Sequence, residues 1–266
     1  MLGLNPAATA WLKLQMPEHA RCRTACAKPA NAQRDRLSII VRANARTAFG
    51  RSHDFAGVRT PADFAARVPM GDHASNVQPW LERMRAPDDS KLTTEPVRFF
   101  EKTSGTSAEA KLIPFTNGLR KEIAHAVAAW MGGLYLEHPS VFAGPAYWSI
   151  SPPLMETHLP VAGVPVGHLD DTSYFPTRSA RALREWLVMN QAGRPDTADT
   201  LYGHTLDQLL ACRDLAFVSV WSPTFFLNLD HRLRERLGHD FTWADQWPQL
   251  AVLSCWTDAQ SSQWPT

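Results

Sequence analysis

The sequence predicts an α/β fold in which helices flank a mostly parallel sheet. Two runs, 215–221 (LAFVSVW) and 250–256 (LAVLSCW), are continuously apolar and partly β-branched, as expected of strands buried on both faces. Segments of helical period precede and separate these runs, and such alternation is typical of parallel strands joined by crossovers. The chain has 266 residues, 44% of them hydrophobic, which is enough for a sizeable core.

The first half of the chain is expected to hold three helices and a strand. Apolar residues recur at helical spacing over 37–48 and are followed by a glycine. Thr60 is expected to cap a short helix over 62–67, and a further short helix is expected over 77–85. The strand, 97–100 (VRFF), runs into a loop of small and hydroxyl residues.

The second half of the chain is expected to alternate between helices and strands. A helix with one apolar face is expected over 119–134, followed by a strand over 146–150 and by two helices that include 183–187 and 206–210. Ser222 then caps a helix that ends before Gly238. No covering helix is expected after the run 250–256. That strand therefore lies at a sheet edge, or the chain ends inside a larger domain.

Charge and cysteine content exclude some classes of protein. Lysine and arginine number 27 and aspartate and glutamate 26, so the net charge of +1 disfavours a polyanion-binding module. The four cysteines are too few and too scattered for a disulfide framework, which indicates a reducing cytoplasm. The chain shows neither a signal-peptide pattern nor an apolar run long enough for a membrane helix.

The segment 99–116 (FFEKTSGTSAEAKLIPFT) carries the clearest candidate chemistry. Small residues allow backbone N–H groups to turn toward an anion, hydroxyls can donate to phosphate oxygens, and a lysine adds a mobile positive charge. The spacing differs from that of the GxxxxGK[ST] loop. An ordinary polar turn between a strand and a helix is the alternative interpretation. Ser104, Thr106 and Ser107 carry the hydroxyls that can donate, and Lys111 carries the positive charge.

These residues resemble a known motif. The stretch 103–111 (TSGTSAEAK) is similar to the phosphate loop of the adenylate-forming superfamily, although Ala108 stands where a glycine is usual. More closely, FEKTSGTSAEAKLIPFT resembles the first nucleotide motif of the Gretchen Hagen 3 family of auxin-responsive acyl-acid amido synthetases, in its bacterial branch. The segments 45–55 (ARTAFGRSHDF), 58–70 (VRTPADFAARVPM), 164–175 (VPVGHLDDTSYF) and 215–230 (LAFVSVWSPTFFLNLD) resemble the family in the same order.

The resemblance implies a two-step ligase that uses ATP and Mg²⁺. By the motif match, the nucleotide-binding residues are Ser104, Gly105, Thr106, Ser107 and Lys111, which would hold the phosphates, and Thr103, which would shape the loop. A carboxylic acid attacks the α-phosphate to give an acyl-adenylate and pyrophosphate, and an amino acid's amine then attacks the activated carbonyl. The family's second and third nucleotide motifs and its small C-terminal domain would follow the run 250–256. The chain is therefore expected to comprise a lead-in, 1–32, and an incomplete adenylating N-terminal domain, 33–266, with a missing C-terminal part as a possible partner.

Other candidate sites are weaker. Trp221 follows a buried strand, at the sheet end where ligands enter open α/β sheets, so Trp221 and Phe225 are candidates for an acyl pocket. No His or Cys spacing indicates a metal site, and Asp170 and Asp171 are expected in a surface turn. Two hypotheses other than a ligase stay open: a catalytically inactive paralogue that acts as a binding protein, and a site completed by a separate polypeptide.

Overall fold

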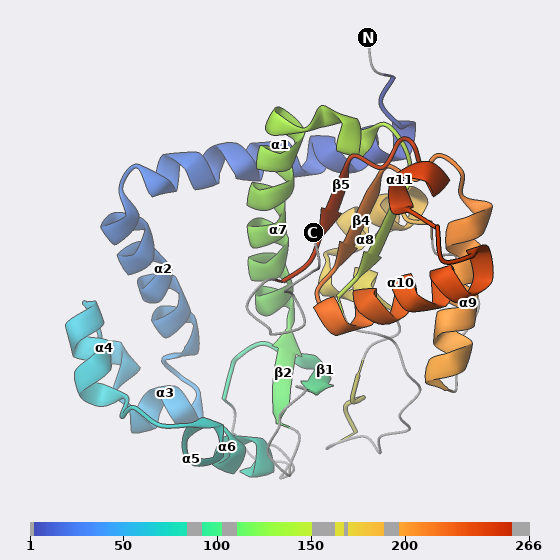
Figure 1. Cartoon of the computed structure of the whole chain (residues 1–266). Coiled ribbons are helices and arrows are strands. Elements are labelled where there is room, and N and C mark those ends of the chain that lie inside the picture. Colours follow the sequence, from blue (N-terminus) through green and yellow to red (C-terminus); the bar gives the residue numbers. More distant parts are fainter. Residues whose placement is uncertain are drawn as a thin grey trace. The chain divides into compact units, whose positions relative to one another are not determined.

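The computed structural model describes residues 3–83, 92–102, 111–150, 163–167, 170–188 and 197–256, with the side chain of Ala198 excluded. The chain divides into two compact units (Figure 1). The first unit comprises the described residues of Met1–His19, Lys121–Thr157 and His168–Thr266, and the second those of Ala20–Arg120 and His158–Gly167. The α/β class predicted from the sequence is confirmed, because helices surround a parallel sheet in the first unit.

The first unit is built on a three-stranded parallel sheet in the order β3-β4-β5. Helix α1 straddles the two units and α7 begins in the second. The elements of the first unit are α1 (Pro6–Cys26), α7 (Asn117–Glu137), η2 (Pro139–Phe142), β3 (Ala146–Ser149), η3 (Asp171–Tyr174), α8 (Thr177–Trp186), α9 (Ala198–Ala211), β4 (Phe217–Val220), α10 (Pro223–Leu237), α11 (Trp243–Gln246) and β5 (Val252–Ser254).

Side chains alternate across β4 and so serve two cores. Val218 and Val220 face a cluster that includes Leu229 and Leu233 of α10. Phe217 lies on the opposite face, with its ring 6.2 Å from those of Trp130 on α7 and Trp186 on α8. All four residues of β4 are buried, as the apolar run predicted.

The second unit is mainly helical and contains a small hairpin. Its elements are α2 (Pro29–Asn44), α3 (Ala48–Ser52), η1 (Phe55–Gly57), α4 (Pro61–Arg67), α5 (His73–Asn76), α6 (Gln78–Arg83), β1 (Val97–Lys102) and β2 (Leu112–Thr116). Strands β1 and β2 are antiparallel, with Lys102 opposite Leu112. On the other side of β1, the N–H of Phe100 donates to Pro165 at 2.8 Å and the N–H of Gly167 donates to Phe100 at 2.7 Å.

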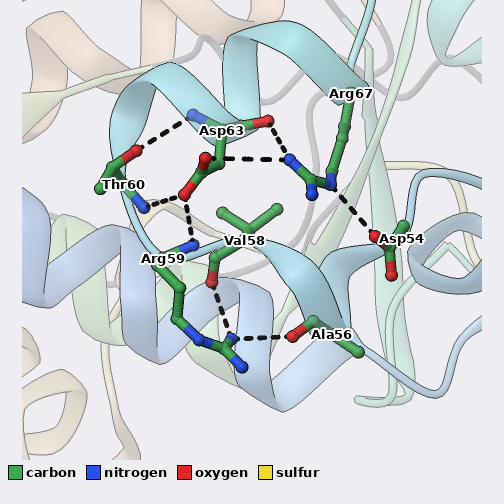
Figure 2. Close-up of polar contacts among 7 residues, drawn as sticks. All are labelled: Asp54, Ala56, Val58, Arg59, Thr60, Asp63 and Arg67. Carbon is green, nitrogen blue, oxygen red and sulfur yellow. Dashed lines mark hydrogen bonds and ion pairs between the residues drawn. The ribbon is translucent and has the colours of Figure 1, made fainter.

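The start of α4 confirms the predicted Thr60 cap. The Thr60 hydroxyl accepts from the backbone N–H of Asp63 at 3.1 Å, and the Asp63 carboxylate accepts from the N–H of Thr60 at 2.9 Å. Figure 2 shows that this capping box continues into an ion-pair network, in which Arg67 lies between Asp63 and Asp54. Arg59 donates to two backbone carbonyls and to the Asp63 carboxylate in the same network (Figure 2). These bonds satisfy helix-end donors that would otherwise lack a partner.

Three details differ from the sequence predictions. The loop after β1 does not lead directly into a helix, because β2 intervenes and pairs back onto β1. The helix expected over 77–85 is α6, which covers Gln78–Arg83 of the described residues, but α5 immediately before it was not predicted. The predicted surface turn is wrong for Asp170, which is 7% exposed and caps η3 by accepting from the N–H of Thr172. Asp171 accepts from the N–H of Ile150 at 2.7 Å. Both carboxylates secure backbone N–H groups, although Asp171 is only half-buried.

Candidate functional site

The predicted phosphate loop connects β1 to β2 in the second unit. Because Lys102 pairs with Leu112, the loop 103–111 begins and ends at the same end of one hairpin. Lys111 immediately precedes β2 and is exposed. The other candidates, Thr103, Ser104, Gly105, Thr106 and Ser107, lie outside the described residues. The structure therefore places an ammonium group at the end of the predicted loop, and the loop's hydroxyl residues stay a prediction.

Two further features converge on this end of the hairpin. The segment 164–167 runs parallel to β1, so the chain leaves Gly167 at the same end as it leaves Lys102. From the helical side, the ring Nε2 of His73 donates to the carbonyl oxygen of Leu112 at 3.0 Å. Sequence analysis did not single out His73, because no local signal shows that α5 packs against β2.

Asp72, the residue that caps α5, is electrostatically coupled to Lys111. The pKa of the Asp72 carboxyl is held below its usual range, first by the backbone N–H of Ser75 and then by the Ser75 hydroxyl, with attraction to Lys111 as a smaller cause. Asp72 is therefore ionised at neutral pH.

In the first unit, a pocket of about 240 Å³ opens at the carboxyl ends of β4 and β5. Open parallel sheets bind ligands at this edge. The rings of Trp221 and Trp256 are stacked there, with centroids 5.1 Å apart. Ser219 is 1% exposed and contributes to the wall. The lining comprises Val127 and Trp130 of α7 together with Ser219, Val220, Trp221, Ser254, Cys255 and Trp256.

The two predicted pocket residues lie in different surroundings. Trp221 lines the pocket. Phe225 lies in the first turn of α10 and is 5% exposed. It belongs to the core cluster on the other face of the sheet, and its ring stacks on that of Tyr202 with centroids 5.2 Å apart. Ser222 is the cap of α10, since its hydroxyl accepts from the N–H of Phe225 at 3.2 Å. Alternation of side chains along the strand could have indicated Ser219 as a further pocket residue, because residues two positions apart, such as Ser219 and Trp221, face the same side of a sheet.

The described residues contain no group of three or more His, Cys, Asp or Glu side chains that could hold a metal ion. All four cysteines are free thiols. Burial and, as a smaller cause, nearby Asp214 raise the pKa of the Cys212 thiol to about 11. Among the helices of the described residues, none is both long and apolar enough to span a bilayer.

Comparison with known proteins shows which family this chain resembles. Residues 19–240 match the GH3 family N-terminal domain. The chain is 35% identical over 94 residues to a rice (Oryza sativa subsp. japonica) protein named jasmonoyl--L-amino acid synthetase GH3.3. The aligned residues make up 35% of this chain and 20% of the rice protein.

Two solved structures are similar in fold. One is the AtGH3.15 acyl acid amido synthetase in complex with 2,4-DB, with a TM-score of 0.62, 19% identity and coverage of 89% of this chain and 40% of that one. The other is a GH3.15 acyl acid amido synthetase, with a TM-score of 0.56, 19% identity and coverage of 75% and 35%. The chain thus spans less than half the length of these relatives.

Proposed function

Because the chain belongs to the GH3 family through its N-terminal domain, we propose that it takes part in the ATP-dependent joining of a carboxylic acid to an amino acid. The carboxylate attacks the α-phosphate of ATP, giving an acyl-adenylate and pyrophosphate. The amine then attacks the activated carbonyl, giving the amide and AMP. Relatives named as jasmonoyl-amino acid and acyl acid amido synthetases support this reaction class.

The observation that carries the proposal is the position of Lys111 at the end of the hairpin loop. A lysine that directly follows a segment of small and hydroxyl residues in the sequence has the donor chemistry that a triphosphate requires, so this chain fits ATP. We assign phosphate binding to Ser104, Gly105, Thr106, Ser107 and Lys111, with Thr103 shaping the loop. Mg²⁺ would bind mainly through the phosphates, as is usual for this ion in nucleotide sites.

We propose that the pocket at the carboxyl ends of β4 and β5 receives the apolar part of the acid. Stacked indole rings offer flat apolar surface, and the Ser219 and Ser254 side chains add hydroxyl groups among them. Trp221 is the assigned pocket residue. Phe225 would act from the opposite face of the sheet by positioning the turn that follows β4.

The rest of the assignment follows from the sequence motifs. We propose that the protein belongs to the bacterial branch of the family and works in a reducing cytoplasm. In this proposal, residues 33–266 form part of the adenylating domain and residues 1–32 are its lead-in. A C-terminal part would be the partner. The chain matches only 35–40% of the solved relatives' length. Binding without catalysis is therefore the second candidate function.

The first test is MgATP binding by calorimetry to the wild-type chain and to Lys111→Ala. Loss of a charge-assisted bond to phosphate is worth roughly 1.5–3 kcal/mol, so we expect affinity to fall at least about tenfold. Lys28→Ala, an exposed lysine of the same unit, is the matched control and should bind normally. Equal affinity of Lys111→Ala and wild type would refute the phosphate role.

Pyrophosphate release separates the two candidate functions. Release that depends on both MgATP and an added carboxylic acid supports the ligase. MgATP binding without such release, across a panel of aliphatic and aromatic acids, supports a binding protein. The same assay repeated with an added C-terminal part of a relative tests whether a partner completes the site.

A further inference from the structure

The pocket at the carboxyl ends of β4 and β5 has a deeply buried polar side chain in its wall. Strand β4 reads FVSV, so Ser219 stands among apolar neighbours, and this serine is 1% exposed. Within the part of the chain that the structure describes, the Ser219 hydroxyl makes no hydrogen bond. A buried hydroxyl without a partner is costly, so a group inside the pocket is expected to supply the missing bond.

The register of the sheet sets a second serine beside Ser219. Ser254 of β5 is its partner in the parallel ladder, and partners in register face the same side of a sheet. Both serines line the pocket, and so does Trp221, which lies two residues after Ser219 and therefore faces the same side. The polar part of the wall is thus a pair of neighbouring hydroxyl groups next to an aromatic surface.

Size and charge restrict what can enter this pocket. None of the described residues that line it carries a charged side chain, so a carboxylate inside it would lose water without gaining a positive partner. The carboxyl group of an acid therefore stays at the mouth while its uncharged body enters. The volume of about 240 Å³ lies below the range of about 300–1,000 Å³ typical of drug-sized ligands, so it suits a body of one ring. The stacked rings of Trp221 and Trp256 favour a flat, aromatic one.

We propose that Ser219 determines which acid is selected, by hydrogen bonding to a hydroxyl substituent on a single aromatic ring. The inference rests on the proposed function, since it assumes that this pocket receives the body of the acid. A serine hydroxyl both donates and accepts, so it matches a ring hydroxyl in either direction. An acid with a methyl group at the same ring position fills similar space but leaves the Ser219 hydroxyl unpaired, and sites built to bond a substrate hydroxyl reject such analogues.

The experiment compares pairs of phenylacetic acids that carry either a hydroxyl or a methyl group at the same ring position. Binding to the whole chain is measured by calorimetry, with quenching of tryptophan fluorescence as a second signal. At the ring position that meets Ser219, the wild type should bind the hydroxyl acid about tenfold more tightly than the methyl acid. Ser219→Ala should bind the two acids equally, and Ser219→Thr, which keeps a hydroxyl, should restore the preference.

Two further variants locate the effect. Trp221→Leu removes part of the aromatic wall, so it should weaken the binding of both acids and leave the ratio of their affinities unchanged. Ser149→Ala changes another buried serine, which lies on β3 and is not among the residues that line this pocket, so it should change neither affinity. Loss of the preference in Ser149→Ala as well as in Ser219→Ala would show a general effect on the sheet and overturn the selective role of Ser219.

Thermal unfolding adds a readout that separates selection from a structural role. A hydroxyl that is paired only by a ligand adds nothing to the stability of the unliganded fold, so Ser219→Ala should melt at the same temperature as the wild type or higher. A clear decrease would mean that the hydroxyl has a partner within the protein, and would overturn the proposal.

The outcomes also separate this inference from the proposed function. Equal affinity of the wild type for the hydroxyl and methyl acids at every ring position overturns the role of Ser219, while the pocket still receives the acid. Failure of the wild type to bind any acid of the panel refutes the assignment of the pocket itself, and the inference falls with it. A preference for the hydroxyl acid that Ser219→Ala loses and Ser219→Thr restores supports both.

Discussion

At Gly132 of α7, an added Cβ would lie 2.5 Å from both Cβ and Cγ of His19. His19 cannot easily yield, because its ring Nδ1 donates to the carbonyl of Ala129 at 2.9 Å. At the next residue, Gly133, the nearest atom to an added Cβ is the His19 Cε1 at 3.8 Å, which is ordinary contact. Two adjacent glycines of one helix thus differ in what a methyl group would meet.

We predict that Gly132→Ala destabilises the protein, although alanine is the better helix former. Overpacking costs about 1–3 kcal/mol, against a helix gain of about 1 kcal/mol. Gly133→Ala has the same gain in helix propensity without overpacking, so it should stabilise the protein by about 0.5–1 kcal/mol. Urea unfolding of the pair gives both values. A more stable Gly132→Ala would mean that α1 and α7 separate easily at this point.

At the scale of the element, the start of α4 depends on an ionised carboxylate. The pKa of Asp63 is lowered first by the backbone N–H of Arg59, and then by the hydroxyl and N–H of Thr60 (Figure 2). A carboxyl whose folded pKa lies below its unfolded value stabilises the fold above the ordinary aspartate range near pH 4. That contribution is lost as the pH falls through the folded pKa.

Asp63→Asn is therefore expected to lower the melting temperature at pH 7 and to have a much smaller effect near pH 2. Asp35→Asn, an exposed aspartate on α2, serves as the control and should change little at either pH. Thermal unfolding by circular dichroism measures both. A decrease of the same size at pH 7 and pH 2 would show that the ionised carboxylate is not what stabilises the α4 terminus.

At the scale of the whole molecule, the two units differ in their cores. The first has a large cluster beside the buried strands β3 and β4, including Val218, Val220 and Leu229. In the second, one cluster has only three buried members, Val41, Phe55 and Val58. Local opening requires less free energy where fewer apolar groups are buried.

Hydrogen exchange should consequently be slowest in β4 and distinctly faster in α2 to α4. Mass spectrometry of the native chain checks this expectation, and MgATP should slow exchange in β1 and β2. Exchange of α4 and β4 in one cooperative event, at equal rates, would mean that the two units unfold together.

Local signals in the sequence determined much of the fold. Ser222 and Thr60 were predicted as caps because capping depends on residues three positions apart, and the two apolar runs predicted the strands β4 and β5. The predicted burial on both faces is confirmed for β4 but wrong for β5, where no residue is buried and Leu253 is 37% exposed. The family resemblance also followed from contiguous motifs and is confirmed by the match over 19–240.

Only the tertiary structure decided which distant residues meet. It paired β2 with β1, brought His73 to Leu112 and placed Trp221 and Phe225 on different sides of the sheet. The contact between His73 and Leu112 joins segments tens of residues apart, and the energies of such contacts depend on packing and charge across space. A local pattern can fix the cap of a helix, but the distant partner of a histidine is determined only when the whole chain has folded.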